Sequence, residues 1–137
     1  MGTFFETITL VNSLDRAFAD SGYIPKDQIR AMEVEAMPDT GAWTLIINDE
    51  VRRKLGLKTD GTVESSMADG STVQYDLTVP VEIRWKNRRT TQQALVVPNA
   101  PDILLGAIPL EGMDLCVDPV NKRLTGVHGD TPVYVVR

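Results

Sequence analysis

Residues 31–47 read Ala31-Met32-Glu33-Val34-Glu35-Ala36-Met37-Pro38-Asp39-Thr40-Gly41-Ala42-Trp43-Thr44-Leu45-Ile46-Ile47. This stretch places a carboxylate and a glycine between two apolar runs. Residues 29–37 alternate polar and apolar side chains, which predicts a strand, and residues 43–47 are typical of a second, buried strand. An ionised Asp39 beside buried strands is costly to desolvate unless hydrogen bonds or a shared proton compensate it. Two interpretations stay open here: a loop Asp that caps an ordinary turn, or a carboxylate held in place for chemistry.

Short strands separated by turns account for most of the remaining chain. One helix is predicted after Asn48, a good N-cap, because acidic residues follow it, basic residues come later and Gly56 closes the segment. Residues 12–21 are expected to form a turn or one helical turn, and residues 107–112 a short helical turn. Further strands are expected at residues 3–11, 62–67, 72–83, 93–97, 115–117 and 132–137. Many short strands with little helix favour a mostly β sandwich or barrel in one domain.

Two hairpins are predicted from turn chemistry. Ala68-Asp69-Gly70-Ser71 carries the Asp-Gly signal of a tight turn between two strands. The basic run Arg84-Trp85-Lys86-Asn87-Arg88-Arg89 lies between residues 83–85 and 93–97, which we expect to pair around it. Because Trp85 lies within this run, a patch for single-stranded nucleic acid is conceivable, but a solvated hairpin turn is favoured.

The composition excludes several classes of function. The chain has 137 residues, 42% of them apolar and 24% charged, as in an ordinary globular protein. Its formal net charge of -5 argues against a nucleic-acid partner, because phosphate binding needs clustered Lys and Arg. No apolar run is long enough for a membrane span, and no signal peptide is recognised. We therefore expect a cytoplasmic protein with neither a nucleic-acid nor a membrane partner.

One histidine, His128, and one cysteine, Cys116, are available for metal or nucleophilic chemistry. They cannot form a zinc site of the usual kind, and the chain lacks the glycine motifs that bind phosphates or dinucleotides. Cys116 lies in an apolar strand pattern, so a buried structural thiol is favoured over a Cys-His nucleophilic pair. Carboxylate chemistry remains, and no metal or cofactor is expected.

Hydrolysis of an amide by carboxylates needs an acid as well as a base. Two carboxylates held together supply both, because they do not ionise together easily and therefore share one proton. The order Asp-Thr-Gly of residues 39–41 is not repeated around Asp60, Asp69 or Asp130. The second carboxylate therefore has to come from a second copy of the chain, which a two-fold dimer supplies.

The sequence resembles the retropepsin-like aspartic proteases, in particular the small bacterial single-domain members related to retroviral proteases. Three motifs carry the resemblance in the family's order: Asp39-Thr40-Gly41-Ala42 matches the catalytic loop, Ala68-Asp69-Gly70-Ser71-Thr72 the flap hairpin, and Ile103-Leu104-Leu105-Gly106 the apolar element behind that loop. The resemblance implies an all-β acid-protease fold, namely a closed, barrel-like single domain over residues 1–137 with one or two short helices.

The resemblance also implies roles for individual residues. Asp39 of each subunit would activate the attacking water, Thr40 would hydrogen-bond across the dimer axis, and Gly41 would let the backbone approach the substrate. Substrate binding would fall to the residue after this glycine and to the flap tip: Ala42, Met67, Ala68, Asp69, Gly70 and Ser71. A polypeptide substrate, a homodimer and the absence of a cofactor are implied with them.

Two residues depart from the family's pattern. Pro38 stands where an aliphatic residue usually precedes the catalytic Asp, and Ala107 stands where retroviral members often carry Arg. Proline removes a backbone donor and is unusual inside a central strand. An alternative function is therefore a catalytically inactive module of the same fold that binds an extended peptide by strand addition. A further alternative is a structural β-domain in which Asp39 only forms a turn.

Overall fold

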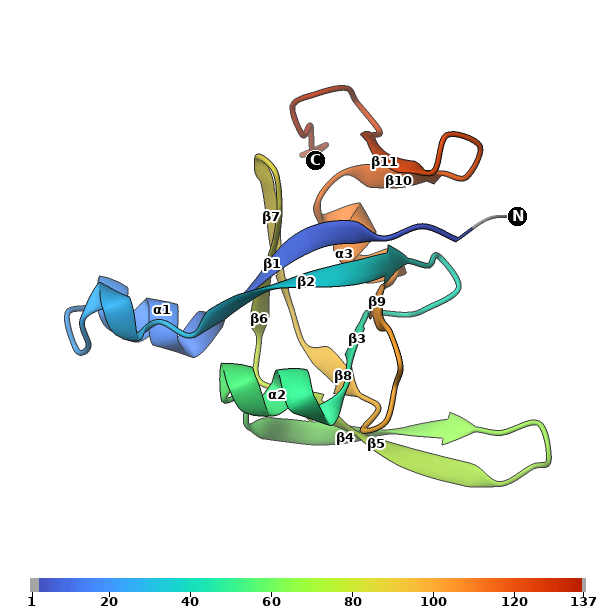
Figure 1. The fold of residues 1–137 in the computed structure, drawn as a ribbon, viewed down its shortest axis with the longest axis horizontal. Helices are drawn as coiled ribbons and strands as arrows, with labels where there is room; N and C mark the ends of the chain where they lie inside the picture. The colour runs from blue at the N-terminus through green and yellow to red at the C-terminus, as the bar shows by residue number, and fades with distance from the viewer. Residues whose placement is uncertain (1–2, 137) are drawn as a thin grey trace.

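The computed structural model describes residues 3–136 (Figure 1). Its elements are short, and in chain order they are β1 (Glu6–Asn12), α1 (Ser13–Asp20), a 3-10 turn (Lys26–Gln28), β2 (Ala31–Pro38), β3 (Leu45–Ile47), α2 (Asp49–Leu55), β4 (Thr59–Ser66), β5 (Thr72–Thr78), β6 (Val81–Trp85), β7 (Arg88–Gln92), β8 (Ala94–Val96), β9 (Ile103–Leu105), α3 (Ala107–Gly112), β10 (Leu115–Asp118) and β11 (Arg123–Gly126). The all-β class is confirmed. The described part of the chain has three α-helices, where one or two were expected.

Nine strands form one sheet in the order β4-β5-β8-β3-β9-β2-β1-β6-β7, and β10 pairs with β11 separately. The sheet is open, which corrects the expectation of a closed, barrel-like domain. The reason lies in its two ends: β4 is the outer strand of a hairpin with β5, and β7 is the outer strand of a hairpin with β6. These two hairpins point in different directions, so their outer strands do not meet (Figure 1).

The centre of the sheet brings together segments that are far apart in the sequence. β9 lies between β2 and β3, parallel to β2 and antiparallel to β3. β8 runs parallel to β3 on the other side. Apolar side chains from these strands, from β1 and from both ends of the chain form one core, whose fully buried members include Ile8, Leu10, Leu45, Ile47, Leu55, Ile83, Leu105 and Met113.

The helix predicted after Asn48 is confirmed as α2. Asn48 Oδ1 accepts a hydrogen bond from the Val51 N–H at 3.0 Å, and Gly56 ends the helix in the left-handed region with φ 63. Residues 12–21 form α1, which is longer than the single turn expected, because the side chain of Asn12 caps it through the Asp15 N–H at 3.1 Å. The helical turn expected at residues 107–112 is confirmed as α3.

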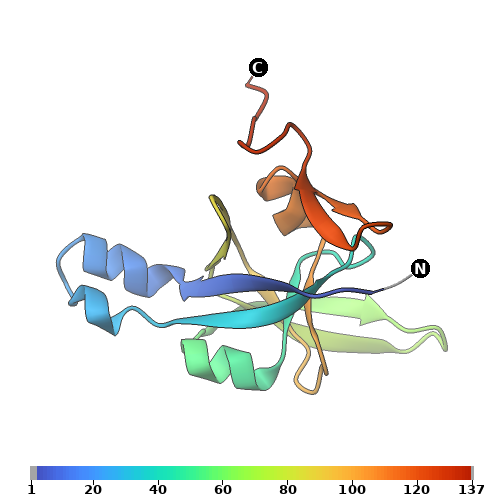
Figure 2. The same ribbon diagram turned by 45° about the horizontal axis from the view of Figure 1, so that its top comes forward.

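α1 lies at the far end of the ribbon that β1 and β2 form, away from the rest of the sheet (Figure 2). An ion pair joins its Asp15 to Arg30 at 2.8 Å, and the Arg30 guanidinium lowers the pKa of the Asp15 carboxyl. Asn12 Nδ2 donates to the Leu55 carbonyl at 2.8 Å, so the base of this ribbon is fixed to the end of α2.

Two strand expectations are corrected. The run at residues 72–83 divides into β5 and β6 on either side of Pro80, which has no N–H to donate to a ladder. Residues 83–85 do form a hairpin around the basic run, but their partner is β7, because the chain turns already at Lys86 and Asn87. Residues 94–96 instead form β8 between β5 and β3.

The C-terminal expectations are also corrected. Residues 132–136 form no strand, and Arg137 lies outside the described residues. Instead, the Val133 N–H donates to Asp114 Oδ2 at 3.0 Å and the Tyr134 hydroxyl donates to the Gly112 carbonyl at 2.8 Å. Cys116 is exposed rather than buried, because β10 has only β11 beside it, and its Sγ lies 3.1 Å from Thr125 Oγ1. Within residues 3–136 no helix has the length and apolar character needed to cross a membrane.

Candidate active site

Asp39 follows directly on the last residue of β2. The register of the parallel pair places Pro38 opposite Leu105, and the Asp39 N–H donates to the Leu105 carbonyl at 3.0 Å. The backbone of Asp39 is therefore fixed to β9 at the centre of the sheet, and its side chain is half-buried.

Pro38 fits this strand without the loss of a ladder hydrogen bond. Backbone N–H groups of successive strand residues point to opposite sides, and that of Asp39 points to β9. The nitrogen of Pro38 therefore faces the side of β1, where the ladder ends at the pair Glu6 and Ala36. Because no strand partner lies opposite Pro38 on that side, the missing donor costs no bond in the sheet.

Residues 39–42 form a tight turn held by the side chain of Asp39 itself. Its Oδ1 accepts a hydrogen bond from the Gly41 N–H at 2.8 Å, and the Ala42 N–H donates to the Asp39 carbonyl at 3.1 Å. A Cβ on residue 41 would lie 3.1 Å from that carboxylate oxygen, so glycine keeps the space beside it open. The turn thus fixes the orientation of the Asp39 carboxylate and leaves Thr40 and Gly41 exposed.

The outer part of this loop interlocks with the start of α3. The carbonyl of Ala42 accepts the Ala107 N–H at 2.9 Å, and the carbonyl of Trp43 accepts the Ile108 N–H at 3.1 Å. Gly106 passes so close that a Cβ there would lie 2.7 Å from the Ala42 carbonyl oxygen and 2.8 Å from the Thr44 nitrogen. This close approach explains why a glycine ends the apolar element Ile103-Leu104-Leu105.

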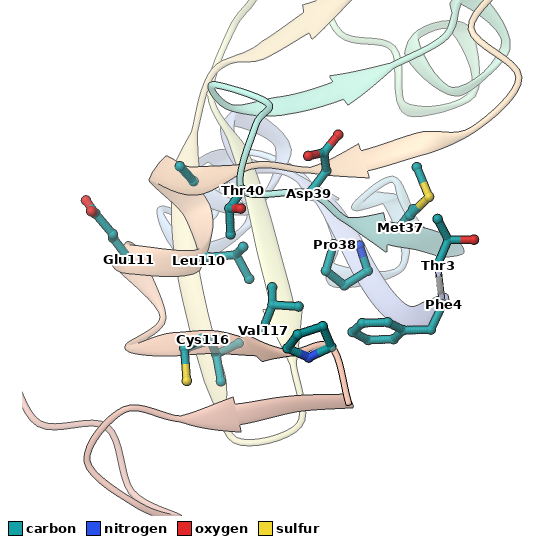
Figure 3. A pocket seen from close by; sticks show the side chains of 13 residues that line it. Thr3, Phe4, Met37, Pro38, Asp39, Thr40, Leu110, Glu111, Cys116 and Val117 are labelled. Carbon is teal, nitrogen blue, oxygen red and sulfur yellow. The ribbon is translucent and has the colours of Figure 1, made fainter. Parts of the chain in front are cut away.

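A hollow of about 630 Å³ opens beside Asp39 and Thr40. Its walls come from residues before β1, the end of β2, α3 and β10, and most of its lining side chains are apolar: Thr3, Phe4, Met37, Pro38, Asp39, Thr40, Ala107, Leu110, Glu111, Leu115, Cys116, Val117 and Pro119. Thr40 points toward Leu110, whereas the Asp39 carboxylate points away from Val117 (Figure 3). The turn at residues 39–42 therefore presents Asp39 at the rim of an apolar depression.

The hairpin predicted around Asp69-Gly70 is confirmed as β4 and β5, with residues 67–71 at its tip, here called the flap tip. Its role as a flap over substrate stays a prediction. The Met67 N–H donates to the Ser71 carbonyl at 2.8 Å, and Gly70 has φ 87. Asp69 Oδ1 accepts hydrogen bonds from the Ser71 hydroxyl at 2.5 Å and the Ser71 N–H at 2.9 Å, and these bonds lower the pKa of the Asp69 carboxyl. The tip projects on the same side of the molecule as the loop after β2 (Figures 1 and 2).

The structure places the predicted site residues in two groups. Asp39, Thr40, Gly41 and Ala42 share one turn, in which Ala42 is buried and the other three are accessible. Met67, Ala68, Asp69, Gly70 and Ser71 form the separate flap tip, where all five are exposed, and none of them lines the hollow. Among residues 3–136 no cluster of three or more His, Cys, Asp or Glu side chains could hold a metal ion.

Sequence reasoning did not identify the walls of the hollow. Phe4, Leu110 and Val117 come from three segments whose apolar residues look like ordinary core in the sequence. The signal that could have found one of them is the Leu105-Gly106 motif, because α3 starts directly after it and carries Leu110.

The sequence model of a family described as "Aspartyl protease" matches residues 28–107, which is more than half of the chain. The matched segment contains the turn at residues 39–42, the flap hairpin and the element that ends at Gly106. No match to a curated protein is found.

Proposed function

The chain belongs to the aspartyl protease family, and on this premise we propose that it is a homodimeric aspartic endopeptidase in which two copies of Asp39 form the catalytic pair. The observation that carries the proposal is the Asp39 turn, whose carboxylate is accessible and held by the Gly41 N–H. Each copy supplies one Asp-Thr-Gly sequence, so a pair of these carboxylates requires two copies about a two-fold axis.

The proposed chemistry uses one ionised and one protonated carboxyl. Two carboxyls at close range share one proton, since both do not ionise together easily. The ionised Asp39 takes a proton from a water molecule whose oxygen bonds to the peptide carbonyl carbon, while the partner carboxyl gives its proton to the carbonyl oxygen. The C–N bond of the resulting tetrahedral intermediate then breaks, a proton passes to the leaving nitrogen, and a carboxylic acid and an amine remain.

The other site residues have supporting roles in this proposal. Thr40 hydrogen-bonds across the two-fold axis below the pair, and Gly41 leaves room for the substrate backbone. The flap tip at residues 67–71 closes over the bound peptide and excludes bulk water, as catalytic lids do. The tip of the β4–β5 hairpin and the loop after β2 project on the same side of the molecule, which supports this role (Figures 1 and 2).

The hollow is the proposed contact face between the two copies. It adjoins Thr40 and is lined by Phe4, Leu110 and Val117, apolar side chains that a second copy would cover. Phe5, the next residue after Phe4, is 47% exposed, and Ile108, the next after Ala107, is 38% exposed. Val133 and Tyr134 are bonded back to Asp114 and Gly112, which favours the N-terminal segment over the C-terminal one as the source of the interface.

The decisive test compares wild type with Asp39→Asn on a mixed peptide library, from acidic to neutral pH, with products read by mass spectrometry. Wild type should cleave peptides and be blocked by a peptidomimetic aspartic-protease inhibitor, and Asp39→Asn should lose essentially all cleavage while it keeps the fold and the dimer. The matched control is Asp130→Asn, the same substitution at an exposed Asp outside the site, which should cleave as wild type does.

The outcome separates the alternatives. Cleavage that persists in Asp39→Asn would contradict the proposed mechanism. A verified dimer that yields no products but retains peptides unaltered would support the inactive peptide-binding module, and a stable monomer with neither property would support a structural β-domain.

A further inference from the structure

β7 is one of the two edge strands of the main sheet. It pairs with β6 alone, and no other segment within residues 3–136 forms a backbone hydrogen bond with it. In an antiparallel pair only alternate residues exchange bonds with the neighbouring strand, so the remaining N–H and C=O groups of β7 face outward. Such an edge is a ready template for one more strand.

One face of the β6–β7 hairpin carries arginines. The register places Arg84 opposite Arg89 and Glu82 opposite Thr91, so these four side chains share a face. Their sequence neighbours on the opposite face, such as Ile83 and Arg88, are buried. The exposed face is therefore polar along its whole length, next to the free edge of β7.

A single buried carboxylate organises this face. Glu82 is only 6% exposed, and its two oxygens contact three guanidinium groups. Arg84 lies 2.8 Å away, Arg89 3.6 Å away, and Arg16 of α1 bonds to the same carboxylate. Arg16 also contacts Asp20 at 3.7 Å, but neither Arg84 nor Arg89 has another acidic partner among the described residues. The cluster, here called the arginine face (Arg16, Glu82, Arg84, Arg89), therefore carries excess positive charge in a chain whose net charge is -5.

We propose that the free edge of β7 and the arginine face together bind an extended acidic segment of a partner protein as an additional strand. The outward backbone groups of β7 give the affinity of strand addition, and alternate carboxylates of the segment meet Arg84 and Arg89. Both side chains are accessible, with 43% and 63% of their surface exposed. Glu82 holds both guanidinium groups in place, which reduces the entropy lost on binding.

The chemistry of the surface favours a polypeptide over a nucleic acid. A single-stranded nucleic acid needs exposed aromatic rings on which bases stack. Trp85 does not offer one, because it is 7% exposed and the Lys86 ammonium lies 4.5 Å from the centre of its ring. Strand addition, in contrast, uses the backbone edge that β7 presents.

This binding surface goes beyond the proposed peptidase activity and does not depend on it. β7 lies at the opposite end of the strand order from β4 of the flap hairpin, so a segment bound there leaves the Asp39 turn free. The test therefore measures binding in the full chain, with Asp39→Asn as the background so that the probe is not cut.

The probe is a fluorescent eight-residue peptide that alternates Glu with Val, compared with its Gln counterpart and with a version that is N-methylated at alternate residues. Fluorescence anisotropy should show binding of the Glu peptide and weaker binding of the other two, because these lack the charge or the backbone donors. Arg84→Gln/Arg89→Gln should weaken binding about tenfold or more, while the Arg16–Glu82 pair remains to hold the fold. Lys58→Gln/Lys122→Gln, with the same loss of charge at exposed lysines, should bind as the parent does.

Hydrogen exchange in the protein that keeps Arg84 and Arg89 locates the bound peptide directly. Backbone amides of Arg89 and Thr91 should gain protection when the Glu peptide is added. Four outcomes would each overturn the proposal. The first is that the peptide protects only the flap and residues 39–42, and the second is that it binds Arg84→Gln/Arg89→Gln and the lysine control equally well. The third is that the protein binds oligothymidylate more tightly than the Glu peptide, and the fourth is that it binds no peptide at all.

Discussion

The Asp39 turn and the tip of the β4–β5 hairpin are both loops with an Asp and a glycine, but they are held in opposite ways. The turn at residues 39–42 is bonded to Leu105 and Ala107, which lie more than sixty residues away in the sequence. At the flap tip, the backbone and side-chain bonds of residues 67–71 are all made within the tip itself. One loop depends on the centre of the sheet, and the other depends on its own turn chemistry.

In the proposed peptidase, this difference suits the two parts of the active site. A carboxylate that must act with a partner at close range has to be positioned within a fraction of an ångström, and the interlocked backbone around Gly106 provides that. A cover that admits a peptide has to move, and an exposed edge hairpin with few buried contacts has the low local stability that such motion requires. Substitutions should therefore have global effects in the Asp39 turn and local effects in the β4–β5 hairpin.

The largest effect is expected for Gly106→Ala. The added Cβ would meet backbone atoms of Ala42 and Thr44, which cannot rotate away. We expect a loss of about 2–3 kcal/mol in the free energy of unfolding and, because the turn shifts, about a hundredfold loss of peptide hydrolysis. Urea unfolding and a cleavage assay measure the two quantities. If Gly106→Ala kept the wild-type free energy of unfolding and the wild-type rate of hydrolysis, the close backbone contact at Gly106 would not be what positions Asp39.

The second prediction concerns acid, because Asp114, which directly precedes β10 in the wall of the hollow, holds the C-terminal segment through the Val133 N–H. The Val133 N–H, and then His128 and Arg88, lower the pKa of the Asp114 carboxyl below its usual value of 3.8. The unfolded chain has the higher pKa, so these bonds stabilise the fold above about pH 3.8, and this contribution is lost as the pH falls further. Asp114→Asn should therefore be less stable at neutral pH and lose less stability on acidification.

Thermal unfolding from neutral pH to about pH 2 measures this difference. Asp69→Asn is the matched control in the flap, because the pKa of Asp69 is also lowered, by its bonds to Ser71. Its acid response should follow wild type, since those bonds fix only an exposed tip. Parallel acid curves for wild type and Asp114→Asn would contradict the assignment.

A smaller effect is expected for Gly70→Ala, the flap counterpart of Gly106→Ala. A Cβ at residue 70 meets no atom within 4 Å, but the backbone has φ 87, which disfavours any other residue. The cost should be about 1 kcal/mol, confined to the hairpin. Hydrogen exchange should show faster opening of β4 and β5 with little change elsewhere, and KM for a cleaved peptide should rise. If Gly70→Ala lowered the free energy of unfolding of the whole protein as much as Gly106→Ala does, the two loops would not differ as described.

The smallest effect is expected for Pro38→Val. Since the nitrogen of Pro38 faces beyond the end of the β1–β2 ladder, valine regains no sheet hydrogen bond. It only raises the entropy of the unfolded chain, so stability should fall by less than about 1 kcal/mol. Peptide hydrolysis should stay within about twofold of wild type. A large gain of hydrolysis with valine would show that the proline distorts the Asp39 turn.

The parts of the fold that the sequence predicted are those with local causes. Asn48 and Gly56 mark the two ends of α2 because a cap needs only residues within a few positions. The Asp69-Gly70 turn joins β4 to β5 for the same reason. The strand partners of residues 83–85 and 93–97 were not predicted correctly, because both runs have strand patterns and the pairing depends on which edge of the sheet each can reach.

The sequence by itself determined that an Asp-Thr-Gly segment follows a strand in a mostly β protein of the aspartyl protease family. Only the structure showed that the Gly41 N–H holds the Asp39 carboxylate. Only the tertiary structure decided how Pro38 fits the strand, which segments surround the hollow, and that β7 has a free edge beside arginines. The physical reason is the range of the interactions. Turns and caps are closed by neighbours in the chain, whereas strand order and cavities follow from the burial of apolar surface that distant segments share.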